Sequence, residues 1–392
     1  MNIAIVSDML NLHQSYLCDA FLHICDKQFT FIEVCKPIEG NHIKMSSSVN
    51  LYDKSYYLPA WKNEQMRKKA MDVICSVDAL IICGGDMFIP YERERLRQGK
   101  LTFEYSERQL KRGIINAFSK TSLSLYKLYM QVGHKNLYKL CSSAYTANDM
   151  YFLHPFFRDR CYKWGYFTHV PIFDVDDVIQ RRRTHEKIKI LSVARLISWK
   201  RIDLIVSLAD MLNQRGADFE INIIGTGPLL NELTQMSTKK GVSDKVNFLG
   251  LMDNNLVHEY MRDADIFIFP SNKREGWGAV LNEAMSNGCA CIASDLIGAA
   301  PFLIDQGKNG FMFKTNSIDD LVNKVVELME QDDLRELISK NAYETMLKYW
   351  NPQIAAQNFC TLVKALKDGE CNPIINGPCS KAEPIKGKTF TI

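Results

Sequence analysis

Short apolar segments alternate with amphipathic segments along the chain. In the first half, apolar runs of strand length lie at 3–6, 29–34, 78–83 and 138–144, and stretches with helical periodicity separate them. Strands that are apolar on both faces, alternating with helices, are typical of a parallel sheet covered on both sides. The pattern therefore predicts an α/β domain in the N-terminal half.

The second half repeats this alternation more regularly, with a helix expected from about Arg201 to Asn213. In open α/β sheets, ligands bind at the carboxyl ends of the strands, so the loops that follow the strands are where a site is expected. The expected strands lie at 188–193, 219–224, 246–249, 266–269, 290–293 and 310–313.

A charged stretch interrupts the pattern in the middle of the chain, and 392 residues are too many for one ordinary core. We therefore predict an N-terminal Rossmann-like domain at 1–172, a linker at 173–186 and a C-terminal Rossmann-like domain at 187–349. Residues 350–392 are predicted to form a terminal helix that packs back on the N-terminal domain, followed by an irregular tail.

Composition indicates a globular protein, with 46% hydrophobic and 24% charged residues. No apolar run approaches the roughly 18 residues that cross a bilayer, and the first strand meets Asp8 too early for a signal peptide, so a cytoplasmic location is expected. The twelve cysteines are spread over strands and helices. Because Cys289 and Cys291 have neither a second pair nor a histidine beside them, we expect reduced thiols and no metal site.

Positive charge concentrates in the first half, where residues 1–183 hold 25 Lys/Arg against 19 Asp/Glu. From 93 to 139 there are eleven basic and three acidic residues, interleaved with aromatic and aliphatic ones, and Ser106 to Gln109 has the pattern of a capping box that starts a helix. Such a stretch either contacts an anionic membrane, here its inner face, or is an ordinary solvated helix. No nucleic-acid motif accompanies it.

Two cations follow the strand at 188–193. Arg195 lies directly after it, and Lys200 lies at or just before the start of the next helix. Free amides give a helix start a partial positive charge, so cations there break the local preference. Together with those amides they would suit a diphosphate, although each side chain alone could simply extend into water.

The Gly225-Thr-Gly-Pro228 turn also joins a strand to a helix. Glycines allow the backbone to approach a ligand closely, and Pro228 suits a first helical turn. Leu230 replaces the third glycine of the dinucleotide fingerprint, which argues against a nicotinamide dehydrogenase. A tight turn without a ligand explains this loop nearly as well.

Two carboxylates frame a third turn, Glu275-Gly-Trp-Gly278 with Glu283 beyond it, after the strand at 266–269. Backbone donors and carboxylate acceptors placed together suit a ligand rich in hydroxyl groups. Glu283 lies in a largely apolar helix, where a charge is costly unless something binds it.

In this order the three motifs, including Ser192 to Arg195, resemble the donor-binding domain of glycosyltransferase family 4 from about Lys187 to Tyr349. The resemblance implies the GT-B architecture, an α/β fold of two Rossmann-like domains that face each other across a cleft. It also implies three catalytic residues, Arg195, Lys200 and Glu275, of which the cations hold the pyrophosphate. The donor sugar would contact Glu275 and the amides of Gly276, Trp277 and Gly278, and the nucleotide would lie beside Gly225, Gly227, Pro228 and Glu283.

The implied activity is a retaining, metal-independent transfer from a nucleoside-diphosphate sugar to a saccharide or lipid-linked saccharide, in surface polysaccharide biosynthesis and without a cofactor. An epimerase or phosphorylase of the same fold, or a non-catalytic sugar-binding subunit, are the alternatives. The family has a glycine pair in the loop after the first strand, whereas here that loop reads Ser7 to Gln14. His13 in this loop is a candidate for the acceptor or phosphate side. A second cleft histidine of the family matches either His134 or His154.

Overall fold

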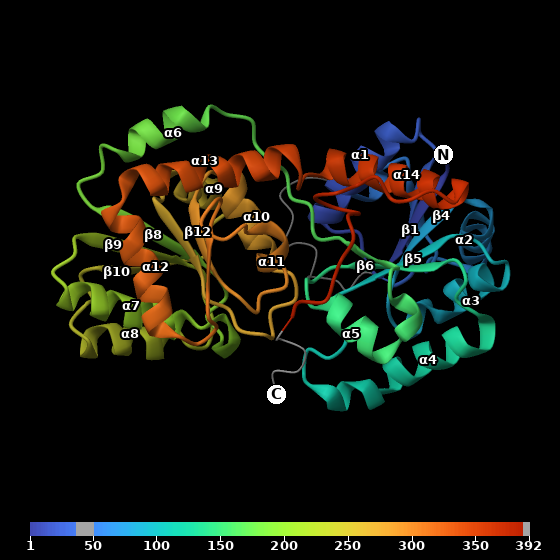
Figure 1. The fold of residues 1–392 in the computed structure, drawn as a ribbon, viewed down its shortest axis with the longest axis horizontal. Coiled ribbons are helices and arrows are strands. Elements are labelled where there is room, and N and C mark those ends of the chain that lie inside the picture. Colours follow the sequence, from blue (N-terminus) through green and yellow to red (C-terminus); the bar gives the residue numbers. More distant parts are fainter. Residues whose placement is uncertain (37–50, 387–392) are drawn as a thin grey trace. The chain divides into compact units, whose positions relative to one another are not determined.

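The computed structural model describes residues 1–36 and 51–386. They form two compact units, which we call unit 1 (1–168 and 349–392) and unit 2 (169–348). Each unit has a parallel sheet with helices on both faces (Figure 1), so the predicted α/β fold with two Rossmann-like domains is confirmed. Within the described residues, every helix is too short or too polar to span a bilayer.

Unit 1 has a seven-stranded sheet in the order β3-β2-β1-β4-β5-β6-β7. The strand order reverses between β1 and β4, which is the arrangement of a doubly wound sheet. Its strands are β1 (Ile3–Ser7), β2 (Phe29–Glu33), β3 (Tyr57–Pro59), β4 (Ala79–Cys83), β5 (Thr102–Ser106), β6 (Leu137–Cys141) and β7 (Cys161–Lys163).

Helices cover both faces of this sheet. The last helix, α14 (Pro352–Asp368), packs on α1 (Leu12–Ile24), with the ring centroids of Phe359 and Phe21 5.6 Å apart. On the other face α3 lies between α2 and α4 (Figure 1). These helices are α2 (Glu64–Ser76), α3 (Ile89–Arg97) and α4 (Lys120–Val132), with the short α5 (Thr146–Leu153) after β6.

After α14 the chain has no further helix up to residue 386, yet it is firmly attached. It runs antiparallel to the edge strand β7: the Lys163 amide donates to the Ser380 carbonyl, and the Cys379 amide donates to the Lys163 carbonyl, each at 2.7 Å. Cys379 and Ala382 are fully buried. This segment therefore covers the edge strand of the unit 1 sheet.

Unit 2 has a six-stranded sheet in the order β10-β9-β8-β11-β12-β13. Here the order reverses between β8 and β11. Its strands are β8 (Ile188–Val193), β9 (Phe219–Ile224), β10 (Val246–Gly250), β11 (Ile266–Phe269), β12 (Ala290–Ser294) and β13 (Phe311–Phe313).

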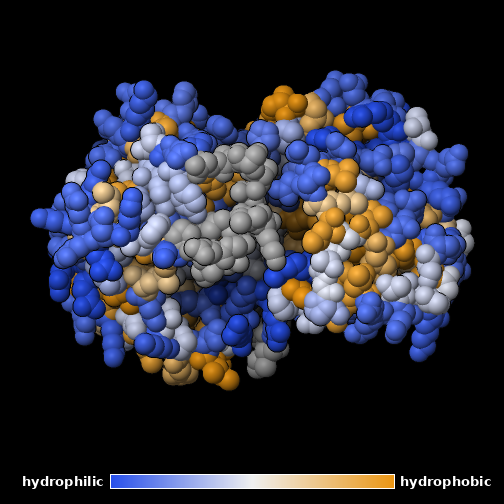
Figure 2. Space-filling view, turned by 180° about the vertical axis from the view of Figure 1, so that it is seen from behind, coloured by the Kyte–Doolittle hydropathy of each residue, from blue (hydrophilic) through white to orange (hydrophobic). Residues whose placement is uncertain are grey.

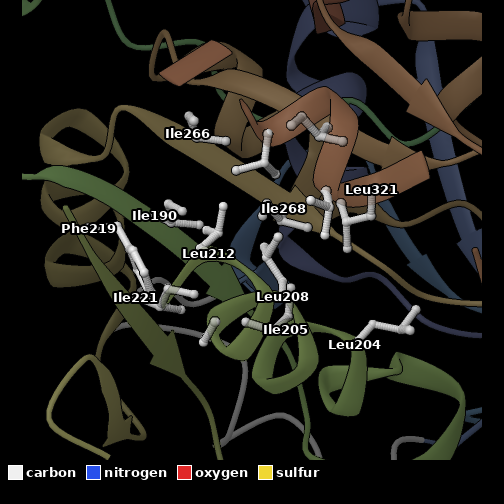
Figure 3. Packing of buried hydrophobic residues seen from close by; sticks show 14 of the residues in the cluster. Ile190, Leu204, Ile205, Leu208, Leu212, Phe219, Ile221, Ile266, Ile268 and Leu321 are labelled. Carbon is white, nitrogen blue, oxygen red and sulfur yellow. The ribbon is translucent and has the colours of Figure 1, made fainter. Parts of the chain in front are cut away.

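The core of unit 2 holds the start of α7 (Ile202–Gln214) against this sheet. Ile205, Leu208 and Leu212 recur at helical spacing and meet Ile190 and Ile268 of the central strands (Figure 3). The loop that joins β8 to α7 is therefore anchored at both ends. The remaining helices are α8 (Leu230–Lys239), α9 (Asn254–Asp263), α10 (Ala279–Ser286), α11 (Ala300–Leu303), α12 (Ile318–Glu330) and α13 (Asp332–Lys348).

Residues 173–186, predicted to be a linker, instead include the helix α6 (Val175–Arg182) of unit 2. The buried Arg182 guanidinium donates to the carbonyls of Met261 (3.2 Å) and Arg262 (3.0 Å) in the last turn of α9. It also donates to those of Asn287 (3.4 Å) and Gly288 (2.6 Å) just after α10. A cation that satisfies the free carbonyls of two helix ends belongs inside a domain, although its charge alone indicated exposure.

The predicted helix start at Ser106 to Gln109 is wrong, because these residues end β5 and enter a loop. Arg108 forms a buried ion pair with Asp149 (3.1 Å), whose carboxylate also accepts from the Leu110 amide (2.8 Å). These long-range contacts draw the loop back to α5. Helical structure in the basic stretch lies on either side of this loop: residues 93–97 end α3, and the 3₁₀ turn η3 (Ile114–Phe118) and then α4 follow the loop.

Candidate functional site

The three sequence motifs of unit 2 come together at one edge of its sheet. Strands β9, β8 and β11 are neighbours and parallel, so the loops 225–229, 194–201 and 270–278 leave the same carboxyl edge. The strand order reverses between β8 and β11, which is where open α/β sheets leave a crevice for ligands. Two of the three loops flank this point.

An ion pair joins the two loops that flank the reversal. Lys200 Nζ lies 2.6 Å from Glu275 Oε2, and both side chains are 14% exposed. Lys200 ends the 3₁₀ turn η5 (Ser198–Lys200), and its ammonium lies 5.3 Å from the ring centroid of Phe269 on β11. The structure thus confines one cation and one carboxylate at the position where a polar ligand would meet them.

The backbone connects the same two loops. The Asn272 amide donates to the Trp199 carbonyl at 2.9 Å, and the Glu275 amide donates to the Asn272 carbonyl at 2.9 Å. The exposed Arg195 has its guanidinium 6.0 Å from the centroid of the Trp199 ring, at the outer limit of a cation–π contact. Trp199 and Asn272 therefore position the predicted residues. Sequence reasoning missed both, and the only signal was that each lies within a motif loop.

The two glycines of the 225–228 turn are required by contact with the loop after β8. A Cβ on Gly225 would lie 2.0 Å from the Ala194 carbonyl oxygen, and one on Gly227 would lie 2.4 Å from that of Leu196. The Leu196 amide donates to the Thr226 carbonyl at 3.0 Å. These close contacts explain both glycines without a ligand. Their position beside a nucleotide stays a prediction.

Pro228 lies in the turn before α8, which begins at Leu230, and so it is not in the first helical turn as predicted. The close packing of the loop on Leu196 extends the turn: the Leu229 amide donates to the Leu196 carbonyl at 3.1 Å, and the helix starts only afterwards.

The start of α10 offers backbone donors. Gly278 has φ +93°, and a Cβ there would lie 2.5 Å from the Phe269 ring, so only glycine fits this left-handed turn. Among the described residues, the amides of Gly276 and Gly278 have no hydrogen-bond partner. The indole of Trp277 is 1% exposed and donates to Asn282 Oδ1 at 2.8 Å. A ligand at this turn would therefore meet backbone groups and not the indole ring.

Glu283 is half-buried within α10 and forms no ion pair within the described part of the chain. Burial raises the pKa of its carboxyl to about 7. The group is therefore close to its midpoint of ionisation at neutral pH. A ligand hydroxyl that donates to this carboxylate would favour the ionised form.

All the other predicted site residues lie in unit 2, but His13 belongs to unit 1. It lies in the first turn of α1, behind the capping residue Asn11, and burial lowers its pKa. Its Nδ1 is buried and has no partner among the described residues. Its assignment to the acceptor or phosphate side stays a prediction.

The other two candidate histidines contact one aromatic cluster of unit 1. The ring of His134 stacks on Phe156 with centroids 3.9 Å apart, and that of His154 lies 5.8 Å from the same ring. Burial lowers the pKa of His154 to about 4, so its ring is neutral at physiological pH. Both side chains therefore contribute to packing.

Comparison with known proteins finds sequence similarity in the region that holds the three motifs. Residues 176–345 match the family model described as glycosyl transferases group 1. The chain is 27% identical over 186 residues to the putative colanic acid biosynthesis glycosyltransferase WcaL of Escherichia coli, covering 46% of this chain and 45% of that protein. It is 27% identical over 177 residues to a GDP-mannose-dependent phosphatidylinositol monomannoside mannosyltransferase of Mycobacterium tuberculosis, covering 44% and 46%. The chain thus spans less than half the length of these curated relatives.

The similarity of fold extends further than the similarity of sequence. The crystal structure of Anabaena Alr3699/HepE in complex with UDP has a TM-score of 0.66 and 14% identity, and the match covers 94% of this chain and all of that one. At this identity the comparison concerns the fold, and it confirms the predicted GT-B class. The family resemblance is likewise confirmed at the level of group 1, whereas membership of family 4 stays a prediction.

Proposed function

Because residues 176–345 match the family model of the group 1 glycosyl transferases, we propose that this protein transfers a sugar from a nucleoside-diphosphate sugar to a saccharide or lipid-linked saccharide. The observation that carries the proposal is the Lys200–Glu275 pair at the reversal of the unit 2 strand order. It supplies a cation for a diphosphate and an acceptor for sugar hydroxyls at one edge of the sheet.

The charges of the site suit departure of a nucleoside diphosphate. As the glycosidic bond breaks, negative charge grows on the diphosphate, and Lys200, Arg195 and the free amides at the start of α10 would stabilise it. Groups fixed before the reaction lower the barrier most, because they need not reorganise. The contacts between the loops provide this rigidity, with Asn272 bonded to Trp199 and Gly225 packed on the loop after β8.

The sugar and the nucleoside would meet the two carboxylates. We propose that Glu275 and the amides of Gly276 and Gly278 bind hydroxyl groups of the transferred sugar, and that Glu283 accepts from the ribose. Retention of configuration and independence of a metal follow from the resemblance to family 4 and stay predictions. The same holds for the absence of a cofactor.

For the acceptor, the names of two relatives suggest a polysaccharide or a glycolipid. One is assigned to colanic acid biosynthesis and the other to mannosylation of a phosphatidylinositol monomannoside. We therefore propose a role in surface polysaccharide or glycolipid biosynthesis, at the cytoplasmic face of a membrane. An epimerase, a phosphorylase or a non-catalytic subunit remain the alternatives.

A ligand screen tests this function directly. We expect one of the uridine, guanosine or adenosine diphosphate sugars to raise the melting temperature, because a ligand at about 100 times its Kd adds about 2.7 kcal/mol to the stability of the native state. The same sugar should then be transferred when a saccharide acceptor is added, with release of the nucleoside diphosphate. No shift with any donor would contradict the proposal. A product formed without acceptor would indicate an epimerase, and a dependence on phosphate would indicate a phosphorylase.

Replacing Glu283 by Gln should remove part of the pH dependence of nucleotide binding. The raised pKa means that the native protein holds this proton more tightly than the unfolded chain does, so the contribution to stability is present below about pH 4.5 and is lost as pH rises through about 7. The affinity for the nucleotide has the opposite pH dependence, because the proposed ribose contact needs the ionised carboxylate, which forms as pH rises. Between pH 6 and 8 the ionised fraction rises about tenfold, and affinity in titration calorimetry should rise in proportion.

The phosphate groups of the nucleotide titrate in the same way with wild type and with Glu283→Gln. The difference between the two pH profiles of affinity therefore reports on the Glu283 carboxyl. Glu259→Gln is the matched control, since Glu259 is exposed on α9 of the same unit. Identical pH profiles for wild type and Glu283→Gln would exclude the proposed ribose contact.

A further inference from the structure

One face of unit 1 exposes large apolar side chains. We call it the η3–α4 face, because the 3₁₀ turn Ile114–Phe118 and the helix α4 form it. Hydrophobic residues lie at the lower margin of the left-hand unit in Figure 2, where α4 runs. The exposed side chains are Ile114 (50%), Ile115 (80%), Phe118 (75%), Leu123 (47%), Tyr126 (50%) and Met130 (62%).

The outer side of α4 is apolar in addition to its inner side. Leu125 and Leu128 are buried against the unit, as expected for an amphipathic helix. Leu123, Tyr126 and Met130 recur at helical spacing on the opposite side, where a solvated helix carries polar residues. A contiguous apolar surface of this kind marks an interaction site.

Cations alternate with these apolar side chains. No Asp or Glu occurs between Glu107 and Asp149. Four exposed cations of this segment form no ion pair with any described residue, and they are Arg112, Lys120, Lys127 and Lys135.

The basic character read from the sequence over 93–139 was overestimated, because some of its cations act inside the unit. Arg95 is fully buried and donates to the carbonyls of Ile74 and Val77, both at 2.7 Å. Arg108 pairs with Asp149, as described above. Lys111 and Lys139 pair with Glu107 and Glu104. Apart from Arg93 on α3, the exposed cations of this stretch that form no ion pair with a described residue are thus the four named above.

We propose that the η3–α4 face binds an anionic lipid bilayer. Ile115 and Phe118, at the tip of the 3₁₀ turn, would enter the boundary between headgroups and acyl chains, and Lys120 and Lys127 would meet lipid phosphates. A bilayer stacks its charged layer directly above its apolar layer, which matches cations interleaved with apolar side chains. The proposal deepens the proposed function by identifying the surface through which a lipid-linked acceptor is reached.

Flotation with vesicles tests this face without donor or acceptor, so its outcome is separate from that of the transfer assay. The full chain should float with vesicles of equimolar phosphatidylcholine and phosphatidylglycerol, and binding should weaken with added salt. Lys120→Glu with Lys127→Glu should reduce the bound fraction at least about tenfold, since each cation near an anionic surface contributes attraction that the reversal turns into repulsion. Ile115→Asp with Phe118→Asp should reduce it similarly by removing the apolar insertion.

Matched variants elsewhere on unit 1 separate this face from general charge and hydrophobicity. Lys68→Glu with Lys69→Glu changes two exposed cations of α2, and Ile375→Asp changes an apolar residue that is 85% exposed. Both should float like the wild type. Equal loss in the control and test variants, or a wild type that stays unbound to anionic vesicles, would overturn the proposal. The second result would direct attention to an acidic protein surface.

Discussion

Replacing Lys200 by Met should lower kcat for sugar transfer by about a hundredfold, the magnitude seen when one fixed donor to developing negative charge is removed. The ammonium is held 2.6 Å from the Glu275 carboxylate and is largely shielded from water, so its position is fixed before a donor binds. Methionine keeps the length and the packing of the side chain but removes the charge. The measurement is steady-state kinetics with the donor identified by the ligand screen.

The ion pair itself provides the second half of this test. Glu275→Gln should also reduce transfer, and the double variant should lose less than the product of the two single losses, because residues in contact are not independent. Lys240→Met is the matched control: Lys240 pairs with Asp210 at 2.7 Å in unit 2 but lies at the end of α8, away from the motif loops. Wild-type kcat in Lys200→Met, or an equal loss in Lys240→Met, would exclude the proposed role.

Arg182→Met should lower the free energy of unfolding by about 3–5 kcal/mol, as expected when several buried carbonyls lose a charged donor. The guanidinium binds the last carbonyls of α9 and those just after α10, within 3.4 Å in each case. No other cation is placed to satisfy them among the described residues. Urea denaturation gives the loss, and hydrogen exchange should show that it concentrates at the ends of α9 and α10.

Arg181→Met is the matched control for that loss. Arg181 is the exposed neighbour, and within the described ranges its guanidinium donates to the Asp177 carbonyl of its own helix (3.4 Å) and to no other residue. We expect a change within about 0.5 kcal/mol. Equal stability of the Arg182 and Arg181 variants would show that the buried guanidinium does not hold α6 to unit 2.

The long, regular elements of the chain could be predicted from the sequence because their signal is local. The strand at 266–269 was located residue for residue, and the helix expected from Arg201 to Asn213 is displaced by one residue. Strands β3 (Tyr-Leu-Pro) and β7 (Cys-Tyr-Lys) were missed because neither forms an apolar run, whereas the equally short β13 (Phe-Met-Phe) does and was located. Strand β5 was missed because its end resembles a capping box, which the ion pair of Arg108 overrides.

The site could be predicted as a set of motifs but not as an arrangement. That Lys200 touches Glu275 depends on β8 and β11 being neighbours, which is a property of the strand order. The same limit hid Asn272, whose amide bonds to the loop after β8. The prediction of a linker at 173–186 was wrong for a related reason. The sequence does not distinguish a buried arginine that binds carbonyls, such as Arg182, from an arginine exposed to water. Local sequence motifs could therefore be predicted, whereas contacts between residues far apart in the sequence could not.

The division of the chain has a consequence for biosynthesis. Unit 2 is one continuous segment, whereas unit 1 needs both the first 168 residues and the part from Tyr349 onward. As a ribosome delivers the chain from its N-terminus, unit 2 can complete its core while unit 1 still lacks the helix that covers α1. The apolar side of α1, including Phe21, therefore stays uncovered until α14 has been synthesised. A stalled or shortened chain would present that surface to chaperones and proteases.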